Sequence, residues 1–168
     1  MIFMSQSGLT DAARMAGWDA WYVEHLRLMA TVPGIYSAQR FKTESDGYSP
    51  SLAMYGIAGP EVFTDPYYLS VRGMGEWLPL IDRRYYKRNL FSGLDRAPSV
   101  RADQVLLVAD RDAEDAHLAD LRLTWLACVG IDRSTAFRGI AVADHAPGGR
   151  GIAVYRPVTE CLLHRPAP

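Results

Sequence analysis

The stretch Trp21-Tyr22-Val23-Glu24-His25-Leu26-Arg27-Leu28-Met29-Ala30-Thr31-Val32-Pro33-Gly34-Ile35 aligns with residues 117–131, where Gly130-Ile131 stands in the place of Gly34-Ile35. Further along, Leu52-Ala53-Met54-Tyr55 aligns with Ile152-Ala153-Val154-Tyr155. The second alignment needs four extra residues, which fall in a glycine-rich loop, where insertions are tolerated best. Because self-similarity of this kind sets the architecture, the sequence predicts one supersecondary unit that occurs twice.

Each predicted unit begins with a strand, a helix and two more strands. Apolar positions recur at helical spacing over residues 12–32, and Pro33-Gly34 ends this first helix. The same spacing predicts a second helix over 113–128. Residues 61–72 are predicted as a further helix. Within 73–94, positions 77–85 suit helical spacing, whereas 85–91 could also be extended. The expected strands are 2–6, 35–42, 51–58, 105–109, 134–143, 151–158 and a short one at 161–163.

The predicted strand at 51–58 is apolar on both of its faces. Side chains alternate between the faces of a strand, and here neither set is polar: Leu52, Met54 and Gly56 on one face, and Ala53, Tyr55 and Ile57 on the other. An antiparallel strand of this kind must be covered on both sides. A helix can cover one side, and a second layer has to cover the other.

These features resemble the dimeric α/β-barrel superfamily, and within it the EthD-like proteins. The resemblance rests on Trp21-Tyr22, His25-Leu26, Pro33-Gly34-Ile35, Ala38, Arg40-Phe41 and Leu52-Ala53-Met54-Tyr55. It implies an α+β fold of two tandem ferredoxin-like repeats, residues 1–96 and 97–168. Their antiparallel sheets would pack face to face into an α/β barrel that shares one core, with the helices outside. Leu121 takes the place of His25 in the second repeat, so we expect any site to lie in the first.

Composition narrows the class of protein. The chain has 168 residues, of which 49% are hydrophobic and 22% charged, and its formal net charge is −1. This balance is typical of a soluble globular protein and gives no electrostatic reason to expect a nucleic-acid or membrane partner. Cys128 and Cys161 lie far apart, as reduced thiols in a cytoplasmic protein would. We expect no cofactor, and no metal either, because the four histidines lack ligand spacing.

His25 and Tyr55 are the candidates for catalysis. A histidine with an ordinary pKa near 6.5 can act as a general acid or base, and the resemblance places His25 on the helix beside the barrel. The phenol of Tyr55 could orient an enol or phenolate. The alternatives are a structural histidine bonded to a neighbouring carbonyl, and an architectural tyrosine, because Tyr155 occupies the same place in the second repeat.

The candidates for substrate binding are aromatic or basic. Trp18, Trp21 and Tyr22 could line a pocket for a flat organic ligand, or they could simply pack in the core. Residues 83–88 form the basic and aromatic run Arg-Arg-Tyr-Tyr-Lys-Arg. Arg84 in this run could bind a substrate carboxylate, and Trp77 could close the mouth of the pocket. The alternative for the run is a solvated or interface surface.

Two functions follow from the resemblance. The first is a small-molecule enzyme that acts by proton transfer on an aromatic or polyketide-like substrate, as a cofactor-free monooxygenase, an isomerase or a cyclase. The second is a non-catalytic EthD-like accessory or ligand-binding protein. Both imply a small hydrophobic or aromatic ligand as the partner. Two repeats in one chain permit a monomer, and an uncovered edge or helix face could also build a homodimer.

Overall fold

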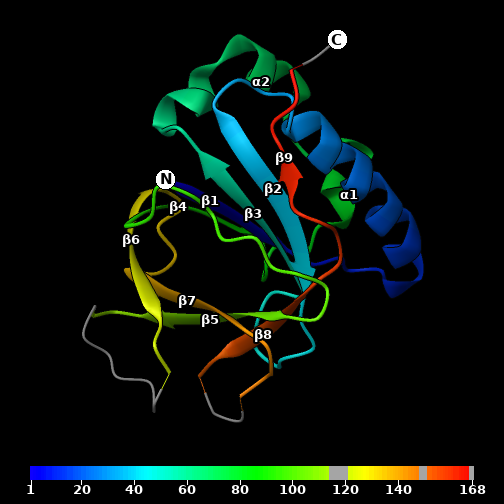
Figure 1. The fold of residues 1–168 in the computed structure, drawn as a ribbon. Coiled ribbons are helices and arrows are strands. Elements are labelled where there is room, and N and C mark those ends of the chain that lie inside the picture. Colours follow the sequence, from blue (N-terminus) through cyan, green and yellow to red (C-terminus); the bar gives the residue numbers. More distant parts are fainter. Residues whose placement is uncertain (114–120, 148–150, 167–168) are drawn as a thin grey trace.

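Eight antiparallel strands form a closed barrel in the computed structural model, which describes residues 1–113, 121–147 and 151–166 (Figure 1). The strands are β1 (Ile2–Ser7), β2 (Ile35–Lys42), β3 (Ser51–Ile57), β4 (Lys87–Ser92), β5 (Val105–Arg111), β6 (Thr124–Ile131), β7 (Phe137–Ala143) and β8 (Ala153–Pro157). Their order around the barrel is β1-β4-β6-β7-β5-β8-β2-β3, and β3 pairs with β1 to close it. A short strand, β9 (Leu162–Leu163), pairs with β2 outside this ring.

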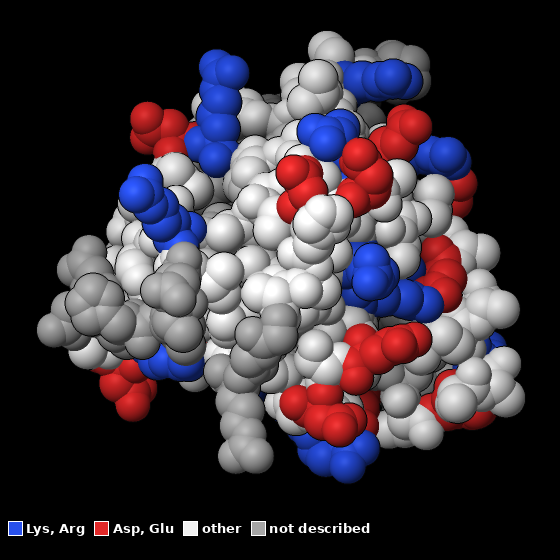
Figure 2. Space-filling model, turned by 60° about the horizontal axis from the view of Figure 1, so that its bottom comes forward, with Lys and Arg blue, Asp and Glu red and all other residues white. Residues whose placement is uncertain are grey.

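The described helices lie on one side of the barrel, next to the strands of the first half (Figure 1). The longest is α1 (Met15–Met29), preceded by the 3-10 turn η1 (Ala12–Arg14). The others are η2 (Pro60–Thr64), α2 (Pro66–Val71) and η3 (Gly75–Leu80). None of these described helices is both long and apolar enough to cross a bilayer. Basic and acidic side chains are interspersed over much of the face drawn in Figure 2.

The predicted fold of two tandem ferredoxin-like repeats with helices outside is wrong. The first half does run strand, helix, strand, strand. In the second half, residues 124–131 form the strand β6, although 113–128 were expected to be helical; residues 114–120 of that span lie outside the described residues. The apolar run 124–131 fits the period of a helix and that of a strand, and strand pairing decides between them. β6 pairs with β4 on one side and β7 on the other, and it directs Leu126 and Cys128 to the barrel interior.

The sequence repeat does not correspond to a repeat in space. Tyr55 on β3 lies on the outer face of the sheet, under α1, whereas Tyr155 on β8 lies inside the barrel. There the hydroxyl of Tyr155 donates to the carbonyl oxygen of Ser49 (2.8 Å). Two aligned strands therefore present opposite faces to the interior, and Tyr155 gives no argument that Tyr55 is architectural. The division at residues 96 and 97 stays a prediction.

The barrel interior is filled by side chains from both halves of the chain. Arg138 is the one described arginine that it encloses completely, and its guanidinium donates to Asp110 (Nε–Oδ1 2.7 Å) and to Gln6 (Nη2–Oε1 2.8 Å). This pairing compensates for the burial of the charge. The apolar members of the interior are Ile2, Met4, Phe41, Leu52, Met54, Phe91, Val100, Leu106, Val108, Leu126, Ile140, Ala153 and Tyr155.

Strands β1 and β3 contribute to two cores at once. Their inward side chains belong to the barrel interior, and their outward ones to a second cluster under the helices. The prediction that both faces of the strand at 51–58 are apolar and covered is confirmed: Leu52 and Met54 point inward, while Ala53, Tyr55 and Ile57 point toward the helices. The space between this outer face and the helices is where a site can form.

We predict that Leu126→Ala lowers the free energy of unfolding by about 2–4 kcal/mol, because it leaves a cavity in the packed interior. The matched change Val129→Ala, at a position 38% exposed on the same strand, should shift it by less than about 0.5 kcal/mol. Urea denaturation of both variants measures the difference. Losses of equal size would contradict a strand with one face in the interior.

Candidate functional site

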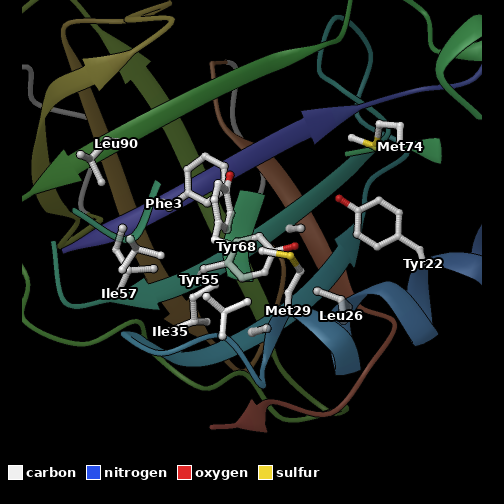
Figure 3. Close-up of a cluster of buried hydrophobic side chains, with 14 of the residues drawn as sticks. Phe3, Tyr22, Leu26, Met29, Ile35, Tyr55, Ile57, Tyr68, Met74 and Leu90 are labelled. Carbon is white, nitrogen blue, oxygen red and sulfur yellow. The ribbon is translucent and has the colours of Figure 1, made fainter. Parts of the chain in front are cut away.

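A cavity of about 270 Å³ lies between the outer face of the sheet and the helices. Figure 3 shows the buried hydrophobic cluster of which part lines this cavity: Tyr22, Leu26 and Met29 extend from α1 toward Phe3 and Tyr55 of the sheet. The volume is slightly below the usual range for small-molecule sites, about 300–1,000 Å³. The lining residues are Phe3, Ser5, Tyr22, His25, Met29, Tyr55, Tyr68, Leu69, Arg72, Gly73, Met74, Tyr86 and Arg88. We call this the tyrosine pocket.

The floor of the tyrosine pocket comes from three neighbouring strands. Phe3 on β1 pairs with Tyr55 on β3, and their rings stack with centroids 5.4 Å apart. Ser5, two residues further along β1, pairs with Arg88 on β4. Because side chains two apart share a face of a strand, these groups must all point outward. The strand register therefore brings an aromatic, a hydroxyl and a cationic group to one surface.

The helix α1 forms the wall that holds His25. Its buried side chains, Trp18, Tyr22, Leu26 and Met29, recur at intervals of three or four and face the sheet. His25 lies beside this stripe and is half-buried, with its imidazole stacked on Trp21 (centroids 4.7 Å apart). Burial disfavours the charged form and lowers the pKa of His25 to about 4. The imidazole is therefore neutral at pH 7 and can accept a proton.

The tyrosines of the pocket are held in their protonated form. Burial raises the pKa of Tyr22 to about 12, although the positive charge of Arg40 opposes this rise. Burial also raises the pKa of Tyr55 and that of Tyr68 above the ordinary value of 10. A protonated phenol is a hydrogen-bond donor. At neutral pH the pocket thus combines one basic imidazole with several hydroxyl groups that can donate to a ligand oxygen.

Arg40 on β2 fixes α1 against the sheet beside this pocket. It is only 1% exposed, and its guanidinium lies 4.3 Å from the ring centroid of Tyr22. It forms an ion pair with Asp19 of α1 (Nη2–Oδ1 2.9 Å), and its Nε donates to Ser51 (3.1 Å). Lys42 pairs with the same carboxylate. These contacts set the position of the helix turn that carries Tyr22 and His25.

The structure separates the predicted site residues into two groups. His25, Tyr55 and Tyr22 line the same cavity. The indoles of Trp18, Trp21 and Trp77 do not line it: they pack against one another, with Trp18 5.0 Å from Trp21 and 5.5 Å from Trp77 between ring centroids. Their packing supports α1, the helix that forms one wall of the pocket.

Arg84 lies away from the tyrosine pocket. Its side chain is 78% exposed and its guanidinium forms a two-pronged contact with Asp82 (Nη2–Oδ2 2.6 Å, Nε–Oδ1 3.0 Å). From the same basic run, Tyr86 and Arg88 do line the pocket.

Sequence reasoning missed the members of the pocket from β1 and α2, and within the run 83–88 it chose Arg84 in place of Tyr86 and Arg88. Tyr86, Arg88 and Leu90 alternate, and this period of two was the signal that their shared face is outward. Ser5 alternates in the same way with Phe3. Tyr68 and Arg72 carry no comparable signal, because the chain breaks at Asp65-Pro66 into η2 and α2 instead of forming one helix over 61–72.

Three other hollows on the described surface lack this combination of an imidazole and several phenols. One of them, about 590 Å³ in volume, lies between residues 99–102 and 157–161. Arg101 in it is paired with Asp103, and burial raises the pKa of the Cys161 thiol, so the reactive thiolate is disfavoured. Cys128 and Cys161 are both free thiols. Across the described ranges, no three His, Cys, Asp or Glu side chains gather as metal ligands would.

Comparison with known proteins identifies no relative of this chain. No protein-family model, curated protein or solved structure matches this chain. The resemblance to EthD-like proteins therefore stays a prediction, and the tyrosine pocket has to be interpreted from its own chemistry.

The lowered pKa of His25 predicts a pH dependence of stability. Between pH 6.5 and pH 4 the unfolded chain binds a proton at His25 that the folded chain does not, so the folded state loses stability as the pH falls through this window. From pH 7 to pH 4.5 the loss from this group is about 2 kcal/mol. Urea denaturation of the protein and of His25→Gln at both pH values measures it. Equal losses in the two proteins would contradict the account.

Proposed function

We propose that the protein is a small-molecule enzyme that abstracts a proton from an aromatic or polyketide-like ketone in the tyrosine pocket. The observation that carries the proposal is that His25 and the hydroxyls of Tyr22, Tyr55, Tyr68 and Tyr86 surround a single cavity. A neutral imidazole can take a proton from carbon, and phenols can donate to the oxygen where the negative charge develops. This is the machinery that enolisation needs.

The proposed step balances without a cofactor. The neutral ring nitrogen of His25 takes a proton from the carbon next to the substrate carbonyl, and the electron pair of that bond moves to the carbonyl oxygen. Tyr22 and Tyr55 donate hydrogen bonds to the resulting enolate oxygen. The imidazolium then returns the proton to the same carbon or to another one along the conjugated system. Return to the same carbon gives hydrogen exchange, and return to another carbon gives isomerisation.

Non-catalytic ligand binding is the second candidate, and one observation favours it. With a pKa of about 4, His25 is a weak base, and a general base works best when its pKa lies near the working pH. Hydrogen bonds from the tyrosines to the enolate would have to compensate for the low basicity of His25. In an accessory protein the same pocket would simply retain an aromatic molecule. A cytoplasmic location, expected from the free cysteines, is a prediction under both candidates.

Deuterium exchange into 2-tetralone, a flat bicyclic ketone, tests the first candidate. We predict that the protein accelerates exchange at the activated carbon above the buffer rate in D2O, followed by proton NMR. His25→Gln should lower the rate by about 100-fold or more, and Tyr55→Phe by about tenfold or more. The matched control His164→Gln, an exposed histidine outside the pocket, should leave the rate unchanged.

The outcome also separates the two candidates. Acceleration that survives in His25→Gln would contradict the assigned role of His25. Binding of 2-tetralone at the tyrosine pocket with exchange at the buffer rate would contradict the enzyme and favour the accessory protein. Ligand-induced shifts of the Tyr22 and His25 resonances report that binding independently of turnover.

A further inference from the structure

Fixed positive charge is concentrated at one end of the tyrosine pocket. Two of its lining residues are arginines: Arg88 from β4 and Arg72 from the residue that ends α2. The described lining includes no Asp or Glu. Burial keeps His25 neutral and Tyr22, Tyr55 and Tyr68 protonated, so the two guanidinium groups supply the net charge of the cavity wall at neutral pH. A ligand with a negative group would therefore be favoured over a neutral one.

The guanidinium of Arg88 has an N–H donor that is not used within the described part of the chain. Its Nη2 donates to Asp132 (3.2 Å), and its backbone amide donates to the same carboxylate (2.8 Å). Its Nε is buried and has no hydrogen-bond partner among the described residues. The guanidinium lies 5.4 Å from the ring centroid of Tyr86, another lining residue. A buried donor without a partner is costly, and a small shift of this side chain toward a bound anion would satisfy it.

Both arginines act on the same part of the pocket. The positive charges of Arg72 and Arg88 each oppose the rise that burial causes in the pKa of Tyr68. Tyr68 is itself a lining residue, from α2. Tyr68, Arg72 and Arg88 thus line one cavity of about 270 Å³, and a carboxylate has two acceptor oxygens for such donors.

We propose that the ligand of the tyrosine pocket is an aromatic acid whose carboxylate is bound between Arg72 and Arg88. This inference rests on the proposed function and names its substrate class. The ring would lie along Phe3 and Tyr55, which are already stacked, and the end remote from the carboxylate would face His25. Asp132 competes for Arg88 from outside the pocket, because it is not among the lining residues.

A pair of matched probes tests the charge preference. 2-Naphthoate and 2-naphthamide have the same ring system, and they differ in charge. We predict that the protein binds the naphthoate about tenfold more tightly than the amide, as one charge-assisted contact would give. The preference should decline as salt is raised, because partly exposed charges are screened. Isothermal titration calorimetry at low and high salt measures both dissociation constants.

Variants locate the preference in the pocket. In Arg88→Gln and in Arg72→Gln the naphthoate should lose most of its advantage, while the affinity for the amide stays within about twofold. Arg88→Gln removes the contact with Asp132 and could unfold the protein. Arg72 is exposed, so Arg72→Gln tests the preference without that risk. Arg84→Gln is the matched control from the same basic run, away from the pocket, and should retain the preference.

Three outcomes would overturn the inference. Equal affinity for acid and amide would remove the charge preference and leave the deuterium-exchange test of the proposed function standing. If both pocket variants still prefer the naphthoate to the amide, the carboxylate binds at a site other than Arg72 and Arg88. Failure of both probes to bind would exclude the ligand class, and 2-tetralone exchange would then decide separately whether the pocket is catalytic.

Discussion

The structure depends on a sheet that has to be buried on both faces. Strands β1 and β3 place large apolar side chains on alternate sides, and such strands are unstable in water unless both sides are covered. The second half of the chain covers the inner face by continuing the sheet until the barrel closes. The helices α1 and α2 cover the outer face. Closure pairs each of the eight described barrel strands on both sides. The helices of the described residues lie on one side, and the tyrosine pocket forms at their boundary with the sheet.

Desolvation sets the chemistry of that pocket. The same burial that stabilises the outer layer lowers the pKa of His25 and raises that of Tyr22, which leaves an acceptor and several donors, all uncharged. Arginines keep their charge when partly buried. This is why Arg72 and Arg88 become the only fixed charges of the described lining. Arg40 contributes from beneath Tyr22, where it links β2 to α1 through Asp19. The polarity of the site thus follows from how the helix is packed.

The sequence predicts the first half of the chain much better than the second. Pro33-Gly34 is a local signal that predicts the start of β2 at Ile35 correctly. The helical period predicts the existence of α1, although the helix was expected over 12–32 and runs over Met15–Met29. The apolar run at 124–131 has no such marker, and its pairing with β4 and β7 is a long-range property that one sequence does not display. The candidate site divides in the same way. His25, Tyr22 and Tyr55 were predicted from short stretches of sequence and, for His25, from the resemblance. Arg88 needs the register between β1 and β4, and the role of the tryptophans as packing needs the full tertiary structure.

Methionine methyl NMR tests the central claim most directly, namely that the functional cavity lies between α1 and the sheet and not inside the barrel. Met29 and Met74 line the tyrosine pocket, whereas Met4 and Met54 lie in the barrel interior. Titration of 13C-methyl-labelled protein with 2-naphthoate should shift the resonances of Met29 and Met74 and leave those of Met4 and Met54 in place. Ring-current shifts at Met4 and Met54 with none at Met29 and Met74 would contradict the account.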